Sequence, residues 1–118
     1  MQDALDRAKA YIEAGVDGIM IHSKSAEARE VLEFAKRYRS MEGKVPLVAV
    51  PTTYNSISFE ELTDAGFNIV VYANHLLRSA YPAMMSTARS ILENKRSLES
   101  ESGLEPVSGL LTLIPGNL

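Results

Sequence analysis

The sequence predicts an α/β fold of three parallel strands with flanking helices. Short apolar runs at residues 17–22, 46–51 and 68–73 lack strict polar alternation, which is typical of strands in parallel sheets. Helical patterns lie before, between and after these runs. A weak repeat, EAGVD at 13–17 and DAGFN at 64–68, precedes the first and third runs. This helix-glycine-strand rhythm suits either a βα barrel or a doubly wound sheet.

The first two helical patterns each show an apolar side. The first predicted helix covers residues 3–14, with Gly15 as its expected C-cap. Its apolar side consists of Leu5, Ala8, Tyr11 and Ile12. The second has the i, i+3, i+4, i+7 spacing of a half-buried helix, at Ala28, Val31, Leu32 and Ala35. Both helices are therefore expected to bury one side.

The third helix has the clearest start signal in the sequence. Ser58 and Glu61 have the spacing of a capping box, in which each side chain bonds the other residue's backbone N–H. Ile57 and Leu62 occupy the positions of a hydrophobic staple. Gly66 is expected to end the helix in the left-handed conformation.

The C-terminal region predicts a broken helix followed by a loop. Because proline cannot donate a backbone hydrogen bond, Pro82 is interpreted as the first turn of a new helix after a short one at 76–80. The apolar stripe of the new helix, which reaches Arg96, consists of Met84, Ala88, Ile91 and Leu92. Residues 99–106 are acidic and turn-rich, which indicates a loop, and the apolar residues 110–114 are expected to pack against another part of the protein.

Composition excludes several classes of protein. The chain has 118 residues, the size of one small domain, and its net charge of -3 comes from mixed charges without a basic block. It therefore predicts no nucleic-acid surface and no polybasic membrane patch. There is no cysteine, and no apolar run approaches the roughly 20 residues that span a bilayer. We expect a cytoplasmic protein.

A three-stranded parallel sheet predicts that the chain is part of a larger fold. An open sheet of this size has two free edges, which invite pairing with other chains. The chain also begins with a helix in the middle of the βα rhythm. The alternative is a small non-catalytic α/β binding or assembly module, which would need a covered edge.

The polar segments that follow the three strands are the candidate site. Active sites of parallel α/β folds lie at the C-terminal ends of the strands, which selects residues 22–25, 51–55 and 73–75. Both histidines of the chain, His22 and His75, are in this set. Each segment also has a structural interpretation: a serine can cap the next helix, a threonine or tyrosine can satisfy a turn, and a histidine can be a core residue.

The same segments do not predict a metal site. No pair of carboxylates lies near a strand end, and the glycines are scattered singly, without a phosphate-binding loop. Glu27, Glu30 and Glu33 lie opposite the apolar stripe of their helix and are expected to be solvated.

Several segments resemble the later barrel strands of the phosphoenolpyruvate mutase family, within the isocitrate lyase and phosphoenolpyruvate mutase superfamily. They are residues 8–11 (AKAY), 14–17 (AGVD), 19–24 (IMIHSK), 50–56 (VPTTYNS) and 72–78 (YANHLLR), and the ending at 113–116 (LIPG) is similar to that of bacterial members. The resemblance implies that residues 1–118 are the C-terminal portion of a single (β/α)8 TIM-type barrel. Its last helix would be swapped between subunits of a homo-oligomer, with Met84, Ala88, Ile91 and Leu92 at the interface.

The resemblance also implies a reaction and residue roles. The family interconverts phosphoenolpyruvate and phosphonopyruvate with Mg²⁺, and the Mg²⁺-holding carboxylates belong to earlier strands outside this chain. His22 matches the histidine that contacts the anionic group of the substrate, as a catalytic donor and electrostatic stabiliser. Asn74 and His75 match substrate-pocket positions at the last strand end. The chain alone is therefore expected to be inactive, and hydrolysis of phosphonopyruvate or carbon–carbon cleavage of a 2-hydroxy acid are alternative activities for the intact protein.

Overall fold

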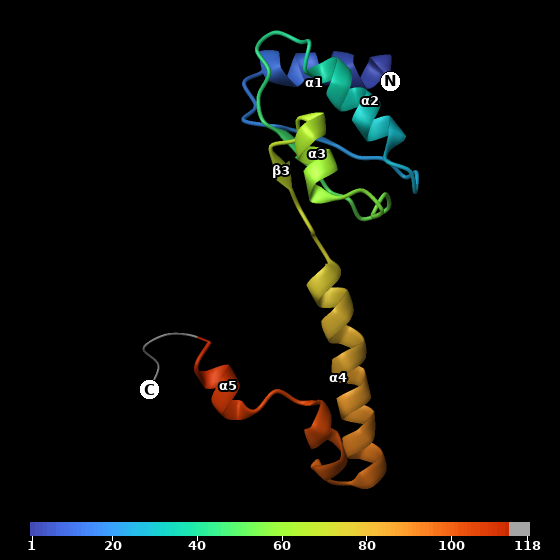
Figure 1. Cartoon of the computed structure of the whole chain (residues 1–118), viewed down its shortest axis with the longest axis vertical. Coiled ribbons are helices and arrows are strands. Elements are labelled where there is room, and N and C mark those ends of the chain that lie inside the picture. The colour runs from blue at the N-terminus through green and yellow to red at the C-terminus, as the bar shows by residue number, and fades with distance from the viewer. Residues whose placement is uncertain (114–118) are drawn as a thin grey trace. The chain divides into compact units, whose positions relative to one another are not determined.

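A computed structural model describes residues 1–113, and the chain divides into two compact units, the first of which ends at Asn74 while the second begins at His75 (Figure 1). Among the described residues, no helix has both the length and the apolar character needed to cross a membrane. Residues 114–118 lie outside the described part, and so do most of the LIPG ending and Ile114 of the apolar segment 110–114.

The first unit alternates helices and strands. Their order is α1 (Gln2–Glu13), β1 (Ile19–Ile21), α2 (Arg29–Tyr38), β2 (Leu47–Ala49), α3 (Phe59–Ala65) and β3 (Ile69–Val70). The strands form one sheet in the order β1-β2-β3, and both neighbouring pairs are parallel. The predicted α/β class with three parallel strands is therefore confirmed, and each strand lies inside its predicted run.

One face of the sheet carries the core. Helix α2 contacts both α1 and α3, and side chains of all three helices join the strands in one buried cluster. The cluster contains Leu5, Ala8, Ile19, Val31, Phe34, Ala35, Tyr38, Leu47, Ala49, Tyr54, Leu62 and Phe67. The apolar sides predicted for the first two helices contribute to it as expected, except that Tyr11 is exposed and Leu32 lies outside the cluster. The helices therefore form a single layer on the sheet.

The other face of the sheet is apolar and open. Met20, Val48 and Ile69 are aligned across the three strands by the parallel register. Met20 is 61% exposed and Ile69 is 49% exposed, because alternate residues of a strand point to opposite faces and the helices cover only the other side. The apolar runs predict strands that are covered on both faces of the sheet, whereas residues 1–74 cover only one face.

The helix boundaries agree with the local signals. The Glu61 N–H donates to Ser58 Oγ over 3.1 Å, and the Ser58 N–H donates to Glu61 Oε2 over 2.8 Å, so the capping box is confirmed. Gly66 ends α3 with φ of 98°. At α1 the C-cap is Ala14, one position earlier than predicted, and Gly15 follows it with φ of 88°.

In the second unit, the predicted break at Pro82 is wrong. Helix α4 runs without interruption from His75 to Asn94 and contains Pro82 (Figure 1). Proline deprives a helix of one backbone hydrogen bond, and the good helix formers on either side of Pro82 continue the remaining ladder.

The segment after α4 also differs from the prediction. Residues 98–103 form a 3₁₀ helix, η1 (Leu98–Gly103), that packs on α4, and α5 (Val107–Leu111) follows it. The predicted loop at 99–106 is therefore mostly helical. Leu110 and Leu113 are exposed, so the described part of segment 110–114 is not covered by any of residues 1–113. Helix α4 likewise has no buried residue in the described chain.

Candidate functional site

The three polar segments lie at the same end of the sheet, where all three strands have their C-terminal ends. Because β1, β2 and β3 are adjacent and parallel, the segments that follow Ile21, Ala49 and Val70 leave the sheet at the same edge. This edge is where parallel α/β folds place their active sites. The shared direction of the strands, on which the predicted site depends, is therefore present in the structure.

His22 is an exposed residue directly after β1. The centroid of its ring lies 6.2 Å from that of Tyr54, and the two ring planes are inclined by 53°. His22 also lines a pocket of about 260 Å³, together with Arg7 of α1 and Glu30 of α2. The imidazole thus has one aromatic neighbour and remains accessible from outside.

Ser23 anchors the backbone next to His22. Its side chain is 94% shielded, and its Oγ donates a hydrogen bond to Glu30 Oε2 and accepts one from the Ser25 N–H over 3.0 Å. The Ser23 carbonyl oxygen accepts a hydrogen bond from Thr53 Oγ1 over 2.7 Å. Glu30 is exposed, as expected, and its carboxylate also reaches back from α2 to the loop after β1.

The interpretation of Ser23 and Ser25 as helix caps is not supported. Helix α2 has Ala28 as its N-cap residue, without a side-chain cap. Ser25 Oγ instead accepts a hydrogen bond from the Glu27 N–H over 3.1 Å, inside the loop. The two serines therefore stabilise the loop that carries His22, and the helix starts independently of them.

Tyr54 lies in the candidate segment 51–55, where the sequence left its role open between the site and a turn. It is fully buried, and its hydroxyl accepts a hydrogen bond from the Val50 N–H over 3.2 Å. Burial raises the pKa of the Tyr54 phenol above its usual value, against a smaller opposite effect of the Val50 N–H. The phenol is therefore neutral at physiological pH. The signal that could have identified Tyr54 is a large aromatic residue in an otherwise polar loop.

The third segment contributes Asn74 and His75. Asn74 is half-buried, and its Oδ1 is shielded from solvent without a hydrogen-bond partner among residues 1–113. His75 is the first residue of α4, in the second unit. A buried amide oxygen without a partner is costly, so Asn74 is suited to accept a hydrogen bond from a group outside the described residues.

The described residues do not fit a magnesium site. Within residues 1–113, no three His, Asp or Glu side chains gather closely enough to hold a metal ion. Mg²⁺ needs several oxygen ligands in octahedral geometry. The described residues therefore do not make a magnesium site by themselves.

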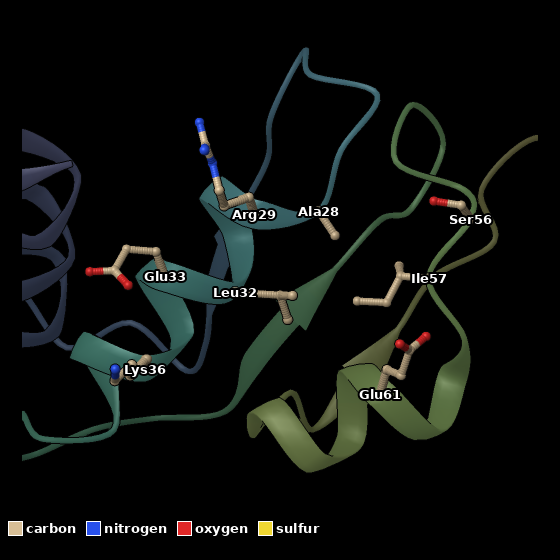
Figure 2. Close-up of a pocket in the computed structure, with 8 residues that line it drawn as sticks. All are labelled: Ala28, Arg29, Leu32, Glu33, Lys36, Ser56, Ile57 and Glu61. Atoms are coloured by element: carbon tan, nitrogen blue, oxygen red, sulfur yellow. The ribbon is translucent and has the colours of Figure 1, made fainter.

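A larger groove lies between α2 and the start of α3, away from the strand-end residues just described (Figure 2). It has a volume of about 470 Å³, and the side chains of Leu32 and Ile57 point toward one another across it. Its charged lining residues are Arg29, Glu33, Lys36 and Glu61. Neither histidine lines this groove, so it is not part of the candidate site.

Comparison with known proteins identifies similar chains. The family model for phosphoenolpyruvate phosphomutase matches residues 1–92. A phosphoenolpyruvate phosphomutase of Tetrahymena pyriformis is 34% identical over 113 residues, which are 96% of this chain and 37% of that protein. The crystal structure of phosphoenolpyruvate phosphomutase from Streptomyces platensis subsp. rosaceus matches with a TM-score of 0.84 and 40% identity, over 93% of this chain and 37% of that one.

A phosphonopyruvate hydrolase in complex with oxalate and Mg²⁺ matches with a TM-score of 0.79 and 35% identity, over 93% of this chain and 38% of that one. The chain thus spans a little over a third of the length of these relatives. The structural match confirms that the three strands and their helices are a piece of a TIM-type barrel fold. On the agreement of sequence, strand topology and structural match, the chain belongs to the phosphoenolpyruvate phosphomutase family.

Proposed function

We propose that the intact protein interconverts phosphoenolpyruvate and phosphonopyruvate, and that this chain supplies the last three strands of its barrel. The observation that carries the proposal is the parallel sheet in a member of this family. Its strands end at the same side, which brings together His22, the loop after β2 and Asn74. The open apolar row of Met20, Val48 and Ile69 supports it, because the inside of a barrel is filled by such layers of side chains.

The reaction is an isomerisation, so its atoms and electrons balance without a co-reactant. The bond from phosphorus to the enol oxygen breaks, and a bond from phosphorus to the methylene carbon forms. His22 acts as a hydrogen-bond donor to the anionic substrate, and it stabilises negative charge there. Asn74 and His75 form part of the pocket wall. The exposure of His22 at the strand-end edge supports this role.

Mg²⁺ is the metal proposed for the intact protein, since the related hydrolase was crystallised with it. When bound, it would supply positive charge to substrate oxygens. Its ligands would come from outside this chain, because residues 1–113 offer no suitable cluster. The chain alone is therefore predicted to be inactive.

A homo-oligomer formed through α4 is also proposed. Met84, Ile91 and Leu92 are exposed, and Leu92 is 78% exposed. Exposed apolar residues at helical spacing are typical of a surface that a second subunit covers. The swapped position of the helix and the cytoplasmic location both stay predictions.

The deciding experiment is an assay of the full-length protein with phosphonopyruvate and Mg²⁺, followed by ³¹P NMR. The mutase reaction converts the carbon-bound phosphorus signal into that of phosphoenolpyruvate. Release of inorganic phosphate and pyruvate would identify a hydrolase. Cleavage of a 2-hydroxy acid such as 2-methylisocitrate, without either phosphonate reaction, would identify a lyase and contradict the proposal.

The non-catalytic module is the remaining alternative, and the open sheet face argues against it. A free-standing module would expose the apolar row of Met20, Val48 and Ile69 to water. A compact monomer of this chain that binds no apolar dye would favour the module.

A further inference from the structure

One side chain joins the loops after β1 and β2 at the candidate site. Thr53 Oγ1 donates a hydrogen bond of 2.7 Å to the carbonyl oxygen of Ser23, a residue 30 positions earlier in the chain. Ser23 directly follows His22, so this bond holds the Ser23–Lys24 peptide unit, one residue along the chain from the imidazole. The Thr53 side chain is exposed, and it belongs to neither the buried cluster nor the sheet.

The loop after β2 also places the Tyr54 ring beside the imidazole of His22. The carbonyl oxygens of Leu47 and Ala49 accept hydrogen bonds from residues next to β3, whereas the Pro46 carbonyl oxygen accepts one from Ile19 of β1. The backbone groups of odd-numbered residues in β2 therefore point toward β3, and those of even-numbered residues point toward β1. The Val50 N–H therefore faces the seam between β1 and β2, and the Tyr54 hydroxyl accepts it there. This bond anchors the Tyr54 ring, whose centroid is 6.2 Å from that of His22.

Ser23 is held from its other side by α2. Its hydroxyl donates to Glu30 and accepts from the Ser25 N–H. With Glu30 on one side and Thr53 on the other, the backbone beside His22 is tied to two different elements. Removal of the Thr53 bond would leave the Ser23 carbonyl unanchored, and the position of His22 would loosen through the backbone of Ser23.

We propose that Thr53 is a positioning residue for His22. The inference rests on the proposed function, in which His22 contacts the substrate. Thr53 does not touch substrate in this account, and it acts only through the peptide unit of Ser23. A displaced donor stabilises the transition state less well, because catalytic groups lose much of their effect when misplaced by about 1 Å.

The test uses the full-length enzyme with three matched variants. Thr53→Val keeps the shape of the side chain and removes the hydroxyl, and Thr53→Ser restores the hydroxyl. Ser56→Ala removes the hydroxyl of an exposed residue that makes no hydrogen bond among residues 1–113 and lines the groove outside the candidate site. We expect Thr53→Val to lower kcat about tenfold, the rate equivalent of one hydrogen bond, with KM changed less than about twofold. Thr53→Ser should recover most of kcat, and Ser56→Ala should match the wild type.

A double-mutant cycle with His22→Ala shows whether the effect passes through His22. In the His22→Ala background, Thr53→Val should lower kcat no further. Thermal unfolding of each variant shows whether folding is intact. An additive loss in the double variant, or a Thr53→Val enzyme with normal kcat, would overturn the inference.

The outcomes of the cycle also separate this inference from the proposed function. If His22→Ala alone has normal kinetics, the role of His22 in the reaction is wrong. If His22→Ala is impaired and Thr53→Val is not, the proposed function stands and only the positioning role of Thr53 is wrong.

Discussion

The His22 and Tyr54 rings, whose centroids lie 6.2 Å apart, come from two different strand ends. His22 is exposed, whereas Tyr54 is fully buried and hydrogen-bonded to the Val50 N–H. An accessible imidazole therefore rests beside an anchored aromatic ring. The His22 imidazole can thus contact a ligand, and the anchored Tyr54 ring can hold that imidazole in place.

The first prediction concerns His22. In the full-length enzyme, His22→Ala should lower kcat by about a hundredfold, the effect of losing one preorganised donor to a developing charge. Steady-state kinetics with phosphonopyruvate provide the measurement. His75→Ala is the informative companion, because a pocket-wall residue should change KM more than kcat. Normal kinetics in His22→Ala would return this histidine to a structural role.

Tyr54 should stabilise the protein through its hydroxyl. Tyr54→Phe keeps the buried ring and leaves the Val50 N–H without its acceptor. We expect the free energy of unfolding to fall by about 1 kcal/mol, the usual net value of one hydrogen bond. Urea denaturation of both proteins gives the difference, and unchanged stability would show that water replaces the hydroxyl at no cost.

The raised pKa of Tyr54 also predicts a dependence on alkaline pH. The unfolded phenol loses its proton near pH 10, before the buried one does, so the unfolded state binds fewer protons in this range. The free energy of unfolding should therefore fall as the pH rises from 10 toward the higher pKa of the folded state. Tyr54→Phe should show a shallower fall over the same range, measured by urea denaturation at several pH values.

The capping box of α3 offers a matched pair of serines. Ser58→Ala removes the acceptor of the Glu61 N–H and should lower the free energy of unfolding by about 1 kcal/mol. Ser56 lies two positions earlier, is exposed and makes no hydrogen bond among the described residues, so Ser56→Ala should change stability little. Equal effects of the two substitutions, measured by thermal unfolding, would contradict the role of the cap.

Two of the three left-handed glycines among the described residues predict a graded effect. Gly15 and Gly66 have φ of 88° and 98°, which a side chain adopts only with strain. A Cβ on Gly15 would meet open space, whereas one on Gly66 would lie 2.4 Å from Arg39 Nε. Each alanine should cost about 1 kcal/mol from its backbone alone, and Gly66→Ala should cost more unless Arg39 moves aside. Arg39→Ala combined with Gly66→Ala measures that difference.

The exposed apolar side of α4 predicts a subunit contact. Leu92→Glu should shift the full-length protein toward smaller species in size-exclusion chromatography with light scattering, because a charge is costly in a covered apolar interface. Its control is Glu93→Gln, a change at a neighbouring exposed residue of the same helix. If Leu92→Glu leaves the oligomer intact, the interface lies elsewhere.

Local patterns predicted much of the fold because their causes lie within a few residues. The Ser58 and Glu61 bonds span three positions, so the sequence alone locates the start of α3. The three apolar runs likewise indicate the strands. Pro82 shows the limit of such reasoning: a local rule predicted a break, and the surrounding helix formers continue α4 through it.

The sequence by itself determined the α/β class, the three strands and the family resemblance. Only the tertiary structure decided that Thr53 bonds Ser23, that Glu30 turns back to the loop of His22, and that one face of the sheet is left open. The physical reason is distance along the chain. A bond across 30 positions depends on the parallel register of β1 and β2, which no local pattern of residues encodes.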